Sequence, residues 1–359
     1  MNIRFLYFLF FCVGMVSPTK AQFQVSGDKV FFGGVNINYG DIWAHTPSIQ
    51  YVEGQSVNLQ ARWYRELNDD ADWTSPFRHP ITGLALHYIS TNTTLLEDGY
   101  GATLFIEPRI FDSEKFSVKT RIHGGLAYRT TKYNREENPL NLLISTDISF
   151  MFELKMLIDY KFSEHFGLGV NYSFTHFSNG AVKQPNLGLN IPTYGFNLNY
   201  YPESEWFKKT AKRKVDYNRN LRFGVALGTG TRHFLENTDK YSQLLSMDLH
   251  ALKRLSPWYA LELNLNVLHR QGSIEEKEVY STDYHQFVGA SLGNEFRFKN
   301  LAVLIQYGYY FYNSRNFDGA LYGRNGARYY FSEHFFTSVT MVNHGKTADY
   351  VNFSVGFFL

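Results

Sequence analysis

Residues 148–162 read ISFMFELKMLIDYKF, and every even-numbered position in this stretch is apolar or aromatic. The odd-numbered positions carry the charged residues Glu153, Lys155, Asp159 and Lys161. Successive side chains of a β-strand point to opposite faces, so this period of two gives one apolar face and one charged face. The stretch therefore predicts a long strand that lies between an apolar medium and a polar one.

The same alternation recurs along the chain, for example at residues 259–267 and 351–359. Several of these stretches exceed the ~5–6 residues usual for strands of globular sheets. Tyr, Phe and Trp ring the apolar faces, as in the aromatic girdles of outer-membrane barrels, and the chain ends in Phe357-Phe358-Leu359. A soluble β-sandwich also alternates. Strand length and aromatic content instead favour an all-β fold, a transmembrane antiparallel β-barrel of the outer-membrane type with a polar lumen.

Composition excludes several other classes of protein. The 359 residues include 35 Lys and Arg, 33 Asp and Glu and one Cys; aromatics make up 18% and charged residues 19%. Mean hydropathy is −0.30, and beyond the N-terminal stretch no apolar run approaches the ~20 residues of a membrane helix. These values exclude a helical membrane protein, a disulfide scaffold and a charge-driven disordered chain. The near-neutral charge also argues against nucleic acid as a partner.

Residues 1–21 have the pattern of a secretory signal, with a short polar start, an apolar stretch and a small residue before Gln22. An apolar stretch of about 12 residues is too short for a membrane anchor. Cleavage after Ala21 would remove Cys12, Arg4 and Lys20, which leaves 35 − 2 = 33 basic residues against 33 acidic ones. The expected location is the outer membrane of a Gram-negative-type bacterium.

Short and long connectors alternate between the predicted strands. Our trace gives about sixteen strands, with twelve or fourteen as alternatives, and both termini on the periplasmic side require an even number. In such barrels the short turns face the periplasm and the long loops face outward. The longer polar segments lie at residues 41–54, 131–138, 180–192, 233–240 and 272–283.

An internal repeat divides the chain. The sequence YKFSEHF at residues 160–166 recurs as YYFSEHF at 329–335. Generic turn chemistry is one explanation, but the shared downstream layout favours a duplicated eight-strand unit. We expect one barrel half over residues 22–203, a basic periplasmic connector over 204–219 and a second half over 220–359. A single large barrel is the preferred arrangement, and two tandem eight-stranded barrels are the alternative.

The segment THFSNG at 175–180, followed by KQPNLGLN at 183–190, carries the candidate chemistry. On the strand from Phe166, His176 and Ser178 share the outward face with Phe, Leu, Val and Tyr. They are roughly 6.5–7 Å apart at the backbone, a distance that an imidazole can bridge to act on a serine hydroxyl. The alternative is that both are interfacial polar residues at a strand end.

These residues resemble the signature of the outer-membrane lipid A 3-O-deacylases of the PagL type, a His-x-Ser-Asn core followed by Pro-Asn-x-Gly. The resemblance is close over residues 160–200 and weaker over the rest of the first half. The second half extends beyond the family's usual length. The resemblance implies an eight-stranded barrel with a lipid-facing Ser–His–Glu site that hydrolyses an ester-linked acyl chain of lipid A.

Carried over to this chain, the resemblance makes Ser178 the nucleophile and His176 the general base. The position of the triad Glu falls at Asn190, whose carbonyl can accept from the imidazole but brings no charge. Replacing a triad acid by its amide can cost ~10⁴ in rate where the tautomer is lost. The resemblance further assigns oxyanion or substrate binding to Asn179, Gly180 and Asn186.

The second copy of the repeat lacks the serine, because His344 is followed by Gly345 and Lys346. Its histidine is also displaced by one residue relative to His176, which reverses the facing unless a bulge corrects it. No histidine spacing suggests a metal, and no cofactor is expected.

Two functions follow from these observations. The first is an outer-membrane esterase that acts on lipid A or lipopolysaccharide in the outer leaflet. The second is a non-catalytic channel or surface-interaction barrel that keeps the motif. The acyl chain removed and the oligomeric state stay open.

Overall fold

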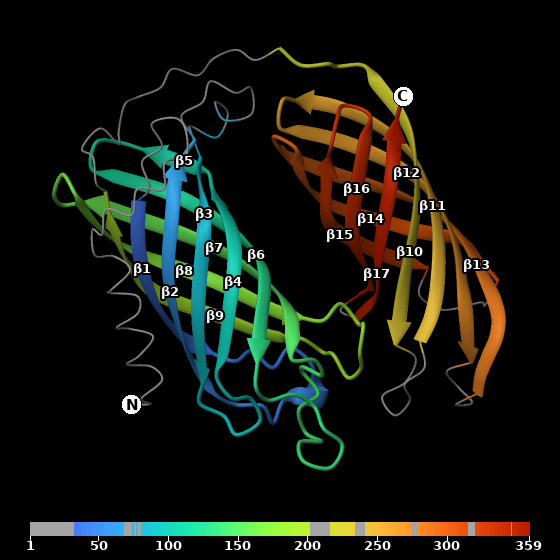
Figure 1. The fold of residues 1–359 in the computed structure, drawn as a ribbon, viewed down its shortest axis with the longest axis horizontal. Helices are drawn as coiled ribbons and strands as arrows, with labels where there is room; N and C mark the ends of the chain where they lie inside the picture. Colours follow the sequence, from blue (N-terminus) through green and yellow to red (C-terminus); the bar gives the residue numbers. More distant parts are fainter. Residues whose placement is uncertain are drawn as a thin grey trace. The chain divides into compact units, whose positions relative to one another are not determined.

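The computed structural model describes residues 32–67, 74, 77, 80–201, 216–233, 241–274, 279–314, 320–345 and 347–359. The predicted signal sequence and most of the basic connector lie outside the described residues. The chain forms two compact units that divide near residue 212, with residues 180–186 grouped with the second unit. Figure 1 shows the two units in blue to green and in yellow to red.

The first unit is a closed ring of eight antiparallel strands. The ring runs β1-β2-β3-β4-β6-β7-β8-β9 and closes through β1 and β9, while the short β5 extends beside β6. A short 3₁₀ helix, η1 (Pro47–Ile49), lies in the loop after β1. The strands are β1 (Phe32–Asp41), β2 (Gln55–Glu66), β3 (Ile81–Thr91), β4 (Gly99–Glu107), β5 (Arg109–Asp112), β6 (Phe116–Arg129), β7 (Ile148–Lys161), β8 (Phe166–Ser178) and β9 (Leu189–Tyr200).

The second unit is also a closed antiparallel barrel of eight strands, in which each strand pairs with the next and β10 pairs with β17. Its strands are β10 (Leu221–His233), β11 (Tyr241–Ser256), β12 (Tyr259–Ile274), β13 (Val279–Phe298), β14 (Leu301–Asn313), β15 (Leu321–Tyr330), β16 (Phe335–His344) and β17 (Thr347–Phe358).

The structure confirms the β-barrel class and selects two eight-stranded barrels, the alternative arrangement. The preference for a single large barrel was wrong for an identifiable reason. Strand β1 pairs with β9 from Gly33–Tyr200 to Gly40–Thr193, while β8 occupies the other edge of β9. Strand β9 therefore has no open edge for β10. Among the described residues there are seventeen strands, of which sixteen form the two rings.

Strand β7 behaves as its alternation predicts. Its even-numbered residues, from Ile148 to Tyr160, are 40–59% exposed, whereas the odd-numbered residues from Ser149 to Asp159 are at most 3% exposed. The apolar face therefore points outward, where lipid would cover it, and the charged face points into the barrel. None of the helices in the described residues is long or apolar enough to cross a membrane.

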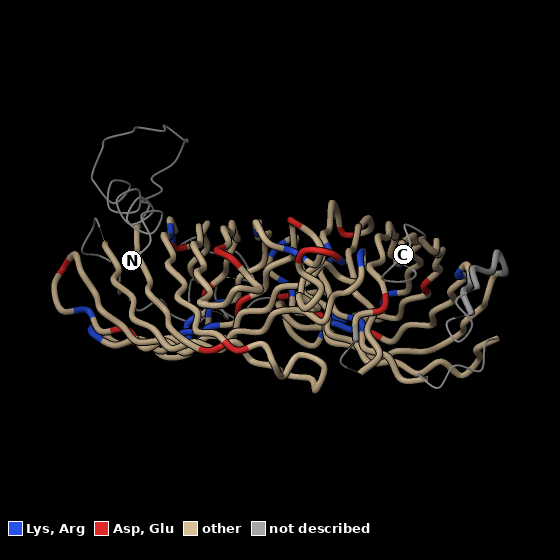
Figure 2. Tube along the Cα trace, turned by 90° about the horizontal axis from the view of Figure 1, so that it is seen from below, with Lys and Arg blue, Asp and Glu red and all other residues tan. Residues whose placement is uncertain are grey.

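Charged side chains fill the first lumen as opposed pairs. Lys119 Nζ lies 2.7 Å from Glu107 Oε1 and 2.5 Å from Asp159 Oδ2, and Arg121 Nε also binds Glu107. Gln60 Nε2 donates to Glu153 Oε2 at 2.8 Å. A buried charge is tolerated only when it is paired and hydrogen-bonded, so these side chains account for the polar odd positions of β7. Figure 2 shows that Lys, Arg, Asp and Glu are a minority along the trace.

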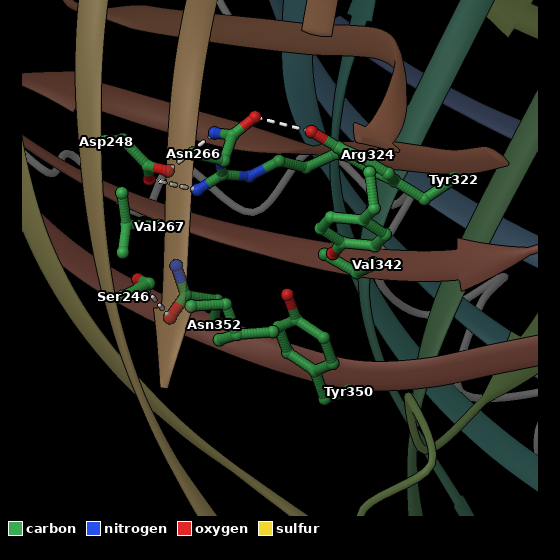
Figure 3. Close-up of a pocket in the computed structure, with 11 residues that line it drawn as sticks. Ser246, Asp248, Asn266, Val267, Tyr322, Arg324, Val342, Tyr350 and Asn352 are labelled. Atoms are coloured by element: carbon green, nitrogen blue, oxygen red, sulfur yellow. Dashed lines mark hydrogen bonds and ion pairs between the residues drawn. The ribbon is translucent and has the colours of Figure 1, made fainter. Parts of the chain in front are cut away.

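The second lumen is filled in the same way. Arg328 donates to Glu295 and Glu262, each at 2.8 Å, and Arg324 lies 2.5 Å from Asp248. Figure 3 shows Asp248 and Arg324 beside Asn266 and Tyr322 in one continuous polar network. The cavity that they line measures about 10 Å³, the order of volume that one water needs. Eight-stranded barrels are just wide enough for side chains to fill them.

The repeated Ser-Glu-His sequence has the same structural task in both barrels. It forms the turn between the sixth and seventh ring strands, β7–β8 and β15–β16. His165 Nδ1 lies 2.8 Å from the Tyr201 carbonyl, and the Tyr201 amide donates back to the His165 carbonyl at 2.8 Å. His334 and Phe358 make the same two contacts at the same distances. Each turn therefore fastens the end of the last strand of its own barrel.

At the opposite end of the first barrel, long loops fold over the strand ends. The segments 42–54 and 140–145 contribute Ile42, Ile49, Val52, Leu143 and Ile144 to a buried apolar cluster. The β3–β4 connection adds Leu96, and strands supply the rest of this cluster: Ile89, Ala127, Met151, Phe177, Leu189 and Ile191. The cluster fixes the loops against the ends of β7, β8 and β9.

The luminal pairing predicts a large loss of stability when one partner is removed. Glu107→Gln removes the carboxylate shared by Lys119 and Arg121. It should lower the free energy of unfolding by ~3–5 kcal/mol, because the buried Arg121 loses its carboxylate and Lys119 loses one of the two that it contacts. Urea unfolding of the refolded protein, followed by tryptophan fluorescence, measures this. Glu164→Gln in the exposed β7–β8 turn is the matched control and should leave stability unchanged. Equal stabilities for the two variants would contradict the pairing.

Candidate active site

The candidate residues gather at the loop end of β8. Strand β8 keeps the alternation of its neighbours, so His176 and Ser178 share the parity of the exposed residues Leu168, Val170 and Tyr172. His176 is half-buried, whereas Ser178 is only 7% exposed at the last position of the strand. Two polar side chains therefore interrupt a face that is otherwise apolar.

Strand register places Asn190 directly opposite His176. The β8–β9 pairing matches these two residues, and the β7–β8 pairing sets Phe152 on the other side of the histidine. His176 Nδ1 and Asn190 Oδ1 are 2.6 Å apart. Since the carboxamide oxygen can only accept, the proton lies on Nδ1 of His176 and Nε2 is the basic nitrogen. This is the tautomer that a general base acting on a serine requires.

The Asn190 carboxamide has a second partner that sequence reasoning missed. Asn190 Nδ2 donates to His45 Nδ1 at 2.9 Å. The structure therefore contains a chain of side chains, His176–Asn190–His45, built from β8, β9 and the loop after β1. No periodicity or motif marks His45, because the contact depends on the path of a loop between distant strands.

Two backbone features hold this chain of side chains in place. The amide of Trp43 donates to the Asn190 carbonyl at 2.9 Å, which attaches the loop to the first residues of β9. Gly188 has φ +79°, and a Cβ built there would lie 2.8 Å from Cε1 of His176. Both the backbone angle and the space available therefore require glycine where the chain passes the imidazole.

The three residues expected to bind an oxyanion differ in their contacts and backbone conformation. The Asn179 carboxamide donates from Nδ2 to Ser145 Oγ at 3.0 Å. The backbone amide of Asn186 donates to Gln184 Oε1 at 3.1 Å, and Gly180 has φ +69°. Among the predicted site residues, a hydrogen bond joins the side chains of His176 and Asn190. Oxyanion binding by Asn179, Gly180 and Asn186 stays a prediction, as do the roles of Ser178 and His176.

Apolar surface surrounds the polar pair. Phe150 and Phe152 are 46% and 45% exposed, and Trp43, whose ring packs edge-on against Phe174, is 53% exposed. Tyr194 is 71% exposed on β9. A long acyl chain could lie along these side chains while its ester reaches the polar pair. Within the described residues, no group of three or more His, Cys, Asp or Glu is placed to hold a metal ion.

His344, the histidine of the second repeat copy, has a different environment. Its Nε2 lies 3.4 Å from Asp349 Oδ2, a carboxylate that also binds Arg270 and Arg232. The buried residues of β16 are even-numbered, from Phe336 to Val342, so His344 has the parity of the inward face, unlike His176. The register shift beside Val342 skips Asp349 of β17 and leaves the alternation of β16 unchanged. His344 therefore belongs to an ion-pair network of the second barrel.

Comparison with known proteins gives two family matches. Residues 56–201 match the family described as lipid A 3-O-deacylase (PagL), and residues 219–359 match the family described as acyloxyacyl hydrolase, C-terminal domain. No curated protein matches the chain significantly.

Solved structures match more distantly. The crystal structure of the outer membrane enzyme PagL aligns with 46% of this chain and 97% of its own, at 15% identity and a TM-score of 0.36. The TodX monoaromatic hydrocarbon channel (deltaS2 mutant) aligns with 91% of this chain and 88% of its own, at 9% identity and a TM-score of 0.19. The COG4313 outer membrane channel from Pseudomonas putida F1 aligns with 95% of this chain and 99% of its own, at 8% identity and a TM-score of 0.23. Similarities at this level do not decide function.

The contact between Gly188 and His176 predicts that Gly188→Ala displaces the imidazole. The methyl group would meet Cε1, and an alanine in the left-handed region costs ~1–2 kcal/mol. A crystal structure of the variant should show the bond between His176 and Asn190 broken. Gly345→Ala is the matched control, since Gly345 has φ +59° with no atom within 4 Å of its built Cβ. That variant should lose similar stability and keep the His176–Asn190 distance; an unmoved His176 in Gly188→Ala would contradict the prediction.

Proposed function

Because residues 56–201 belong to the lipid A 3-O-deacylase (PagL) family and residues 219–359 to the acyloxyacyl hydrolase C-terminal family, we propose that this outer-membrane barrel protein is a lipid A deacylase. The substrate is an ester-linked acyl chain of lipid A or lipopolysaccharide in the outer leaflet. The family assignment agrees with the motif at residues 176–190. The active site, on this proposal, is the lipid-facing pair His176 and Ser178 with Asn190 in place of the triad acid.

One observation carries the proposal, namely the 2.6 Å contact between His176 Nδ1 and Asn190 Oδ1. Placing a polar side chain on a lipid-facing surface costs free energy. Ending a strand does not require a hydrogen-bonded pair that holds an imidazole in the tautomer of a general base, so the pair supports a catalytic role. On this proposal Ser178, two residues further along β8, supplies the hydroxyl that Nε2 activates.

The reaction follows from these positions. Ser178 Oγ attacks the carbonyl carbon of the acyl ester while His176 Nε2 takes the hydroxyl proton. The tetrahedral intermediate collapses with cleavage of the bond to the sugar oxygen, which receives the proton from the imidazolium. Water then attacks the acyl-serine with His176 again as base, and releases the fatty acid. Asn179, Gly180 and Asn186 would donate to the negative oxygen of the intermediate.

Membrane depth supports this assignment. The short turns of the first barrel lie at one end and the long loops at the other. In outer-membrane barrels the long loops face outward. His176 and Ser178 lie at the loop end of β8, the level at which the ester bonds of an outer-leaflet glycolipid meet the interface. The exposed rings of Phe150, Phe152 and Trp43 offer apolar surface for the acyl chain.

The competing channel function fits the structure poorly. In both barrels, charged and polar side chains fill the described lumen as paired groups, and the cavity in the second barrel measures about 10 Å³. A surface-interaction barrel without catalysis remains the other outcome of the experiments below.

Replacing the nucleophile should abolish the reaction. In Ser178→Ala, release of fatty acid from purified lipid A should fall by about three orders of magnitude or more, because no group is left to form the acyl intermediate. Mass spectrometry of the lipid A measures this. Ser48→Ala, in the exposed part of the loop after β1, is the control and should keep full activity. Unchanged lipid A acylation in Ser178→Ala would rule out the proposed site.

Restoring a carboxylate at the acid position should raise activity. In Asn190→Asp, kcat should increase by about ten- to a hundredfold, since a charged partner stabilises the imidazolium that forms in the transition state. The gain is smaller than the full cost of losing a triad acid, because Asn190 already selects the correct tautomer. Asn92→Asp in an exposed loop makes the same change of charge elsewhere and should leave kcat unaltered. A lower kcat in Asn190→Asp would show that Asn190 does not occupy the acid position.

A further inference from the structure

We propose that His45 is a positioning residue for this reaction, which fixes the orientation of the Asn190 carboxamide and through it the tautomer of His176. The inference rests on the proposed function and adds a residue outside the matched family region, which begins at residue 56. It follows from the contact between Asn190 Nδ2 and His45 Nδ1 at 2.9 Å.

An amide at the acid position creates a problem that a carboxylate does not have. The two oxygens of a carboxylate are equivalent, so either can accept the proton of the histidine. A carboxamide has one acceptor end and one donor end. If Asn190 presented Nδ2 to His176, the imidazole would have to carry its proton on Nε2, and that nitrogen could not take the proton of Ser178.

With its own proton on Nε2, His45 selects one of the two orientations. Its Nδ1 accepts from Asn190 Nδ2, which leaves Oδ1 facing Nδ1 of His176. The reversed amide would need both histidines to change tautomer together. Because the three groups are joined in series, the protonation pattern of His45 is passed to His176 through a single carboxamide.

The loop that carries His45 is fixed at several points. The Trp43 amide binds the Asn190 carbonyl at 2.9 Å, and the Ile42 amide binds the Gly54 carbonyl at 2.9 Å. The Trp43 ring packs edge-on against both His45 and Phe174, with centroids 6.2 and 6.1 Å apart. A residue that must hold an amide in one of two orientations needs such a fixed frame.

The test compares two substitutions of His45. His45→Phe keeps a ring against Trp43 but removes the acceptor, so kcat should fall by about tenfold, the effect of one lost hydrogen bond, with KM unchanged. His45→Asn places a carboxamide oxygen where Nδ1 stands and should retain native kcat. The same two substitutions in an Asn190→Asp background should change kcat by less than about twofold, because a carboxylate needs no orienting.

A second readout does not depend on activity. The ¹⁵N chemical shifts of the His176 ring in detergent-solubilised protein report which nitrogen carries the proton. The native protein and His45→Asn should show the Nδ1–H tautomer, and His45→Phe should show a mixture. Electrophoretic mobility of unheated samples verifies that each variant is a folded barrel.

The outcomes separate the two proposals. Unchanged kcat and ¹⁵N shifts in His45→Phe, or equal losses in His45→Phe and His45→Asn, would overturn the role of His45. Equal losses with and without Asn190→Asp would also overturn it, because they would indicate a purely structural loop residue. If Ser178→Ala releases fatty acid as well as the native protein, the deacylase proposal fails, while the ¹⁵N shifts still decide whether His45 orients the amide.

Discussion

The antiparallel pairing of β1 with β9 is the interaction on which the rest of the first barrel depends. It closes the ring after eight strands, so that no backbone edge is left to face lipid. A ring of this size has a lumen that side chains fill completely. The charges of Glu107, Lys119 and Asp159 occupy it as pairs, and substrate has no room there. On the proposed function, chemistry on a large lipid would therefore be confined to the outside of the barrel and to its loop end.

The same strand pairing determines which residues meet at that end. The β8–β9 register sets Asn190 opposite His176, and the β1 loop, which begins where β1 leaves β9, brings His45 to the same carboxamide. Polar groups on a lipid-facing surface are stable only if they satisfy one another. The chain His176–Asn190–His45 meets this requirement, and its cost on an apolar face is the physical reason to regard it as functional.

Sequence alone predicted what depends on local periodicity. The facing of β7 follows from alternation at residues 148–162. On β8 the alternation continues as far as the half-buried His176, whereas Ser178 at the strand end is buried. Ring closure could not be predicted, because the pairing of Gly33 with Tyr200 joins segments far apart in sequence. His45 was missed because a loop has no period, and its contact exists only once the barrel closes.

The second barrel separates the requirements of the fold from those of the chemistry. Its Ser-Glu-His turn binds the end of β17 through His334 with the same two contacts that His165 makes in the first barrel. At the other end, His344 Nε2 lies 3.4 Å from Asp349 Oδ2, and the sequence has no serine two residues after His344. The duplicated turn therefore serves closure of each ring. Since the second barrel closes without a counterpart of the His176 site, closure of an eight-stranded ring does not require such a site. Its polar residues on the first barrel therefore call for a role other than closure.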